Sequence, residues 1–140
     1  MISAQQKRYI LQRAQYRCEY CVSPMSHAIQ PFNVEHVIPE IKGGTDDLDN
    51  LASACGGCNG HKYIKTHAID PFDNQLVPLY HPRLMGWQAH FIWSDDYLEI
   101  VGISPIGRAT VKTLNLNRLG VVNLRRLLLL DGLHPPTNKP

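Results

Sequence analysis

The sequence predicts a small α+β protein in which two short strands and one helix form a core held by cysteines. Three observations favour this class. Two C-x-x-C pairs, at 18–21 and 55–58, enclose two short apolar segments at 33–38 and 51–54. Glycine pairs, the first at 43–44, mark turns after these segments. The chain has 140 residues, which is the size of one ordinary domain.

The first half is expected to contribute a basic helix followed by the strands and helix of the core. Residues 3–17 repeat apolar side chains at helical spacing with basic ones between them, which predicts an amphipathic helix. Residues 33–38 predict a strand that Pro39 stops, and residues 51–54 predict a second strand. The next helix is expected to begin near residue 58 and to run past residue 65.

The second half predicts a hairpin and two helices. Residues 70–82, rich in Pro, Asp and Asn, predict an ordered loop, and residues 90–101 predict a hairpin. Ser104 before a proline is a typical helix start. Asn117 is expected to cap a last helix that ends at Gly132. We therefore divide the chain into a core at 1–70 and an extension at 71–140 that packs on it.

Composition excludes several classes of protein. The formal net charge is only +2, so any affinity for nucleic acid must come from local patches. Residues 1–17 hold no apolar signal segment, and the most apolar run, at 127–130, is far too short to span a bilayer. We expect a cytoplasmic protein without a membrane partner, in which thiols stay reduced.

The spacing of Cys18, Cys21, Cys55 and Cys58 is typical of a zinc site. Four thiolates close a tetrahedral site and leave no open position, so the Zn²⁺ is expected to be structural, contributing on the order of 10 kcal/mol. The glycines at 56–57 let the backbone curl so that both sulfurs face one ion. The alternatives are two disulfides or unrelated buried thiols.

An acid–histidine pair, Glu35-His36, lies between the cysteine pairs. Neighbouring side chains on a strand point to opposite faces, so strand periodicity alone would separate the two. Taken singly, Glu35 reads as an exposed acid and His36 as an ordinary half-buried histidine. Asn50 and Asn59 taken singly read as turn or cap residues.

Several blocks together resemble one known family. The blocks are Glu35-His36-Val37-Ile38-Pro39, Gly43-Gly44, Asp49-Asn50-Leu51 and Cys55-x-x-Cys58-Asn59-x-x-Lys62. In this order they resemble the HNH endonucleases of the ββα-metal (His-Me finger) fold, in the branch whose strands and helix are clamped by four cysteines. The resemblance covers residues 17–66. Residues 90–110 also resemble the tail of some small bacterial and cyanobacterial HNH proteins.

The resemblance implies a role for each matching residue. His36 would be the general base that takes a proton from the attacking water, and Asn50 would help to orient it. Glu35 and Asn59 would hold a catalytic divalent ion, Mg²⁺ or Mn²⁺, because both offer oxygen ligands. His61 is an alternative ligand to Asn59. Because the base must be neutral, activity is expected to fall at acid pH.

Basic residues are candidates for contacts with DNA phosphates, although the second-half ones could equally form solvated helix faces. The candidates are Lys62, Arg108, Lys112, Arg118 and Arg125. The resulting hypothesis is a metal-dependent endonuclease that hydrolyses DNA phosphodiester bonds, nicking with low sequence specificity. The alternatives are a zinc-dependent binding module that does not cleave, a nuclease for RNA, and a purely structural zinc protein. Either a monomer or a homodimer fits the sequence.

Overall fold

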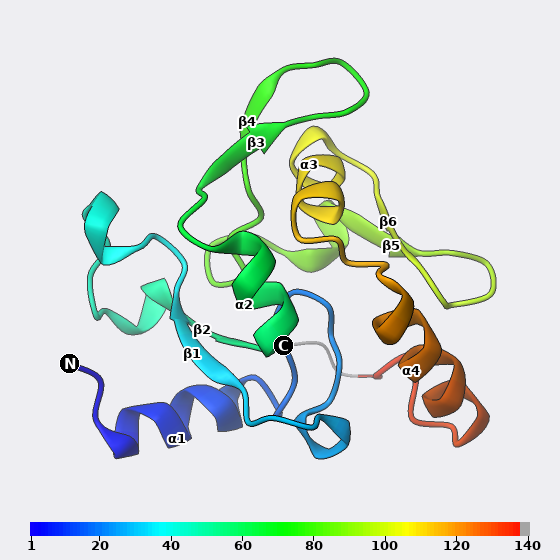
Figure 1. Cartoon of the computed structure of the whole chain (residues 1–140), viewed down its shortest axis with the longest axis horizontal. Helices are drawn as coiled ribbons and strands as arrows, with labels where there is room; N and C mark the ends of the chain where they lie inside the picture. Colours follow the sequence, from blue (N-terminus) through cyan, green and yellow to red (C-terminus); the bar gives the residue numbers. More distant parts are fainter. Residues whose placement is uncertain (138–140) are drawn as a thin grey trace.

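The computed structural model describes residues 1–137, and its first element is the helix α1, Ala4–Arg13 (Figure 1). Ser3 caps this helix: its hydroxyl accepts from the Gln6 backbone N–H, and the Gln6 side chain accepts from the Ser3 N–H. Within the helix only Ile10 is buried, whereas Tyr9 is half exposed. The helix is shorter than the predicted span 3–17, because the backbone at residues 15 and 16 turns to positive φ.

The predicted strand–strand–helix core is confirmed. Strand β1, Asn33–His36, pairs antiparallel with β2, Leu51–Ala54, and α2, Gly56–Lys62, follows. Helix α2 begins earlier than expected because Cys55 is its N-cap. It also ends earlier, at Lys62, because Tyr63 has a φ of 53°. Figure 1 shows α2 beside the β1–β2 hairpin, with α1 below it.

The β1–β2 connection folds back sharply at the glycine pair. Short 3₁₀ helices at Glu40–Lys42 and Leu48–Asn50 frame it. Gly43 adopts a φ of 90°, which suits glycine. A Cβ on Gly44 would lie 1.6 Å from the carbonyl oxygen of Ile38, so only glycine allows this close approach.

Beyond α2 the chain forms one hairpin that was predicted and one, across the expected boundary at residue 70, that was not. Strands β5, Phe91–Trp93, and β6, Ile100–Gly102, form the predicted hairpin. Strands β3, His67–Ile69, and β4, Leu76–Pro78, form a second hairpin, whose latter strand lies in the segment predicted as a loop. Both of these strands have three residues and expose most of their side chains, so they carry no apolar periodicity that sequence analysis could detect.

Two helices complete the extension. Helix α3, Pro105–Thr113, begins as predicted, with Ser104 accepting from the backbone N–H of Gly107 at 2.9 Å. Helix α4, Leu119–Leu130, has Arg118 rather than Asn117 at its N-cap. The Asn117 side chain instead accepts from the Ile100 N–H and donates to the Ile100 carbonyl, which ties the start of α4 to β6. This corrects the cap prediction.

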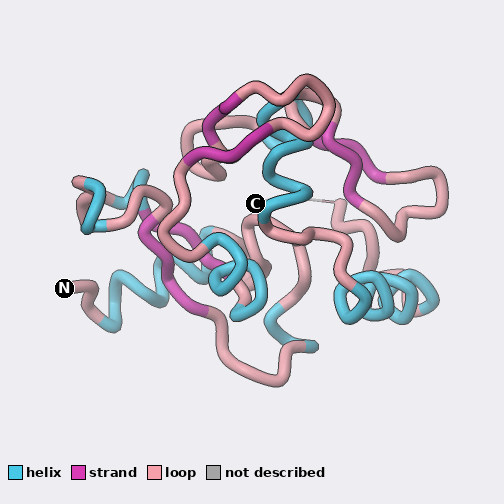
Figure 2. The backbone as a smooth tube through the Cα atoms, turned by 45° about the horizontal axis from the view of Figure 1, so that its top comes forward, coloured by secondary structure: helices cyan, strands magenta, loops and turns pink. Residues whose placement is uncertain are grey.

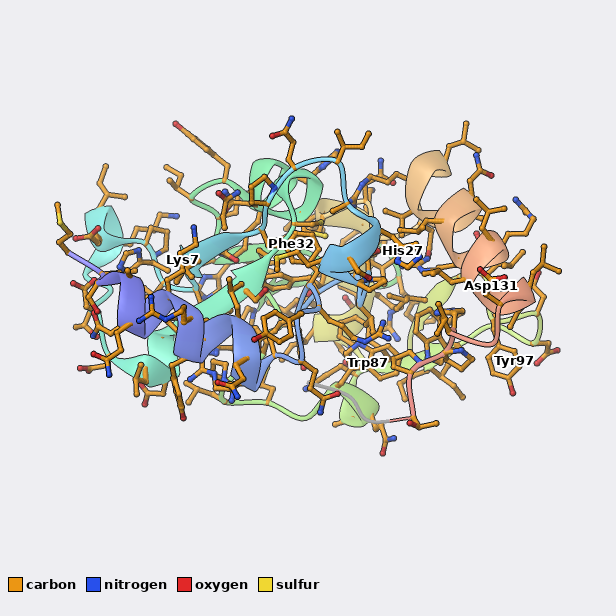
Figure 3. All side chains as sticks on the ribbon, turned by 90° about the horizontal axis from the view of Figure 1, so that it is seen from below. Lys7, His27, Phe32, Trp87, Tyr97 and Asp131 are labelled. Carbon is orange, nitrogen blue, oxygen red and sulfur yellow. The ribbon has the colours of Figure 1, made fainter. Side chains whose placement is uncertain are left out.

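One hydrophobic cluster joins the two halves of the chain. It contains Phe32 and Cys58 from the first half, and Trp87, Phe91 and Leu114 from the second. In Figure 3, Phe32 and Trp87 lie toward the middle of the molecule, whereas Asp131 lies at one end. Figure 2 shows α4 on the opposite side of the molecule from α1. Among residues 1–137, no helix has both the length and the apolar character needed to cross a bilayer.

Candidate metal centre and catalytic site

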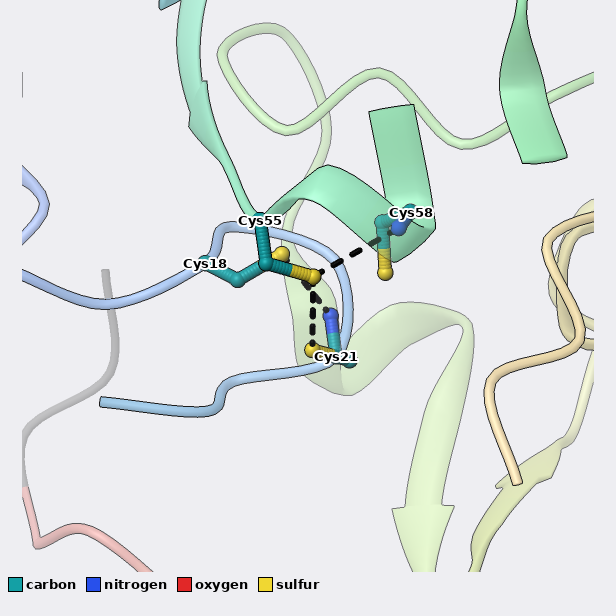
Figure 4. A group of neighbouring side chains, drawn as sticks. All are labelled: Cys18, Cys21, Cys55 and Cys58. Atoms are coloured by element: carbon teal, nitrogen blue, oxygen red, sulfur yellow. Dashed lines mark hydrogen bonds between the residues drawn. The ribbon is translucent and has the colours of Figure 1, made fainter. Parts of the chain in front are cut away.

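The four cysteines converge on one point (Figure 4). Cys18 and Cys21 lie on the loop after α1, and Cys55 and Cys58 lie at the start of α2. All four thiols are free, and their sulfurs lie within 4.8 Å of one another. The Cys21 and Cys55 sulfurs are 3.7 Å apart. A tetrahedral zinc with Zn–S bonds of about 2.3 Å would set its sulfurs about 3.8 Å apart, so the group fits structural Zn²⁺ and the disulfide alternative is wrong.

Backbone N–H groups support this sulfur cluster. The N–H groups of Tyr20 and Cys21 point at Cys18 Sγ over 3.4 and 3.5 Å, and the Cys58 N–H points at Cys55 Sγ over 3.4 Å. Such donors stabilise negative charge on sulfur, which metal binding requires. Without a metal the thiols do not ionise alike: hydrogen bonding within the group, with Cys18 first, lowers the pKa of Cys21, whereas burial raises the pKa of Cys18. The loop and helix start are therefore shaped for thiolate ligands.

His36 lies at the end of β1 beside two acids that sequence analysis did not single out. Its Nε2 is 2.7 Å from Asp46 Oδ1 and 3.8 Å from Glu40 Oε1. Asp46 also pairs with the amino group of Met1 at 3.0 Å. The hydrogen bond with His36 is the main reason that the pKa of Asp46 is lowered. One donor atom from each of His36, Glu40 and Asp46 lies within 4.8 Å of the others, which is close enough to share a cation.

The sequence signal for these acids was weak. Glu40 follows His36 at a spacing of four residues, and Asp46 follows the glycine pair in a run of polar residues. Surface loops commonly hold such acids without any function. Only the fold-back of the β1–β2 connection brings them to the imidazole.

Asn50 holds the segment that follows His36. Its Oδ1 accepts from the Ile38 N–H at 2.9 Å, and its Nδ2 donates to the carbonyls of Ile38 and Thr45 at 3.0 and 2.9 Å. Its backbone carbonyl accepts from the Val37 N–H at 2.9 Å. Ile38, Gly44 and Asn50 also line an open pocket together with His81. Asn50 is thus placed to fix the backbone after His36 rather than to touch a substrate.

Glu35 faces the other side of β1 from His36. Its carboxylate is buried, and Oε1 lies 2.8 Å from Lys62 Nζ on α2. Lys62 is equally buried and also donates to the Val37 carbonyl at 2.7 Å. Burial raises the pKa of Glu35, and Lys62 opposes that rise. Strand alternation separates Glu35 from His36, and Glu35 is paired inside the core, so the expectation that Glu35 and Asn59 hold a catalytic ion stays a prediction that this pairing does not favour.

Asn59 and His61 both lie on α2. Asn59 is half-buried, and its role as an ion ligand stays a prediction. His61 is exposed, and its Nδ1 lies 2.7 Å from the Gly57 carbonyl of its own helix. In the described part of the chain, clusters of three or more His, Cys, Asp or Glu donors are the four cysteines and the His36 group, and His61 belongs to neither. The alternative of His61 as a ligand therefore gains no support.

The residues proposed to contact DNA mostly have internal partners. Lys62 and Arg125 are buried, 1% and 2% exposed, so neither reaches a phosphate in this structure, which corrects that expectation. Arg118 donates toward the sulfurs of Cys55 and Cys58. Arg108 forms a bidentate pair with Asp70, with bonds of 3.0 and 2.7 Å. Lys112 is exposed, and its contact with DNA stays a prediction.

Comparison with known proteins agrees with this geometry. Residues 18–65 match the family model described as HNH endonuclease. No curated protein matches the chain. The matched residues run from the first cysteine of the metal centre to just beyond α2, and so include both strands, His36 and Asn50. Residues 18–65 therefore form a domain that matches the HNH endonuclease family, and their four clustered cysteines fit the variant whose ββα-metal core is held by a zinc knuckle.

Proposed function

We propose that this chain is a metal-dependent endonuclease that hydrolyses phosphodiester bonds of DNA, nicking one strand at a time with low sequence specificity. The observation that carries the proposal is the His36–Asp46 pair at 2.7 Å at the end of β1 within an HNH core. A structural zinc protein needs no such pair. One ββα site cuts one strand, so a double-strand break would need two visits or a dimer.

His36 would act as the general base. Asp46 accepts a hydrogen bond when Nε2 carries the proton, and this leaves the other ring nitrogen, Nδ1, as the acceptor. Within residues 1–137 no hydrogen bond is formed by Nδ1 of His36. Asp46 would orient the imidazole and stabilise its positive charge after it takes a proton from water, as a carboxylate does for the histidine of other hydrolases. Asn50 would keep the following backbone in place.

A divalent ion, Mg²⁺ or Mn²⁺, would complete the site. Glu40 and Asp46 are the carboxylates beside His36 that could hold it, and their oxygens are the donors that these hard cations prefer. When bound, such an ion would stabilise the charge that develops on the phosphate and on the leaving oxygen. Glu35 does not fit this role while it is paired with Lys62. Asn59 would be a further oxygen ligand from α2.

The test compares His36→Ala with His27→Ala, a histidine exposed at the end of the short 3₁₀ helix Met25–His27. Each zinc-loaded protein is incubated with supercoiled plasmid and with a labelled RNA, in Mg²⁺ or Mn²⁺, beside a reaction without added divalent ion. We expect nicked circles from the wild type and from His27→Ala, and a loss of at least about a hundredfold in His36→Ala, as for removal of a general base. Zinc content and circular dichroism show whether each variant is folded.

Several results would overturn the proposal. Equal nicking by His36→Ala would remove the histidine from the mechanism. Binding of plasmid without cleavage under any divalent ion would make the chain a binding module, and cleavage of RNA alone would change the substrate. Asp46→Asn and Glu40→Gln should each raise the Mn²⁺ concentration needed for half-maximal activity, whereas Asp47→Asn, an exposed neighbour, should not. A cytoplasmic location belongs to the same proposal.

A further inference from the structure

Two arginines from the C-terminal extension lie against the zinc knuckle. Arg118, the N-cap of α4, directs Nη2 at Cys55 Sγ over 3.4 Å, and Nη1 and Nη2 at Cys58 Sγ over 3.6 and 3.7 Å. Its guanidinium covers the turn between these cysteines so closely that a Cβ on Gly57 would lie 2.5 Å from Nη2. Gly57 is thus required to let the guanidinium approach.

Arg125, one of the most deeply buried side chains, lies behind the same centre. It is 2% exposed and donates to four acceptors, namely Cys21 O at 3.2 Å, Leu116 O at 2.9 Å, Leu98 O at 3.0 Å and Asn117 Oδ1 at 3.0 Å. Its guanidinium also lies over the ring of Trp93 at 5.3 Å. All of these acceptors are neutral, so the hydrogen bonds orient Arg125 without balancing its charge.

Neither arginine has a carboxylate partner. In the described residues, the ion pairs between side chains use Glu19, Glu35, Glu40, Asp46 and Asp70, and none includes Arg118 or Arg125. A buried guanidinium without a counter-charge is costly. A zinc ion with four thiolates carries two negative charges in excess, buried at the same place. The two unpaired cations and the excess charge of the metal centre therefore match in number and in position.

We propose that Arg118 and Arg125 form a cationic cap that neutralises the four-thiolate zinc centre, with Arg118 controlling how long the metal is retained. Arg118 hydrogen-bonds the two sulfurs of the α2 knuckle, which makes these thiolates less basic and less nucleophilic, so that protons and competing electrophiles displace the metal less readily. Arg125 supplies the second charge from behind Cys21. The extension beyond the matched family segment thus supplies positive charge to the metal centre, in addition to the backbone N–H donors that lie within residues 18–65.

The test follows zinc release from Arg118→Gln, Arg118→Lys and Arg126→Gln. Arg126 is the matched control, because it is exposed on α4 and its side chain donates to Asn123 on the same helix at 2.9 Å. Each protein is mixed with excess chelator beside a zinc-sensitive dye, and the release rate is recorded at low and high salt. We expect release to be at least about tenfold faster in Arg118→Gln, the effect of losing one charge-assisted hydrogen bond. Arg126→Gln should match the wild type.

A second measurement separates a cap from a purely structural anchor. Arg118 also donates to the carbonyls of Leu114 and Asn115, so its loss could loosen α4 without affecting the metal. If Arg118→Gln unfolds more easily but releases zinc at the wild-type rate, the proposal is overturned. Arg118→Lys keeps the charge, so it should release zinc at an intermediate rate and, with Co²⁺ in place of zinc, shift the sulfur-to-cobalt absorption band. Wild-type release and an unshifted band in the lysine variant would also overturn it.

Discussion

Replacing Asn50 by alanine should cost about 3 kcal/mol of unfolding free energy. The side chain makes three hydrogen bonds, one from the Ile38 N–H and two to the carbonyls of Ile38 and Thr45, and Asn50 is only 8% exposed. A typical hydrogen bond contributes about 1 kcal/mol net, and more when a buried partner is left unpaired. For a chain of this length the loss corresponds to a fall in Tm of roughly 10 °C.

The assay is urea and thermal unfolding at fixed zinc concentration, with Asn123→Ala as the control. Asn123 is exposed on α4 and accepts one bond, from Arg126, so its replacement should change stability by less than about 0.5 kcal/mol. A loss below about 1 kcal/mol in Asn50→Ala would refute the reasoning, because the three bonds would then be replaced by water at no cost. If Asn50 also positions His36, any nuclease activity should fall while DNA affinity is kept.

Three further predictions concern the loop, a partly buried ion pair and the metal. Gly44→Ala should lower the unfolding free energy measured in urea by about 2 kcal/mol, because its Cβ would clash with the Ile38 carbonyl. Gly60→Ala is the control, because a Cβ there meets open space, and it should leave stability unchanged or raise it. Equal changes in stability for the two variants would contradict the steric argument. Arg108 holds the pKa of Asp70 at about 2, below the ordinary 3.8, so this pair stabilises the fold fully above about pH 4 and loses its effect as pH falls toward 2. Asp70→Asn should therefore flatten the fall of Tm between pH 4 and 2, and an unchanged slope would count against the pair. Removing zinc with a chelator should abolish the cooperative unfolding transition followed by circular dichroism, and added zinc should restore it. A metal-free protein with an unaltered transition would show that zinc has no structural role.

Local patterns in the sequence predicted much of the fold. The C-x-x-C spacing, the two strands, the β5–β6 hairpin and the Ser104 cap are features whose signals lie within a few residues of one another. Strands β3 and β4, which have three residues each and expose most of their side chains, were not predicted, because so short and exposed a strand carries no apolar period. The HNH motif likewise placed His36 and Asn50 correctly within the core.

The sequence by itself determined that four thiolates would meet and that a histidine would end the first strand between them. Only the tertiary structure decided the partner of each charged group. Glu35 pairs with Lys62 inside the core, His36 meets Asp46, and the guanidinium of Arg118 lies on sulfur. The physical reason is that ligand spacing is a local property of the chain, whereas the partner of a charge depends on which distant segments bury it. A motif therefore predicts which residues are candidates for the site, but it does not predict which side chains they contact in the fold.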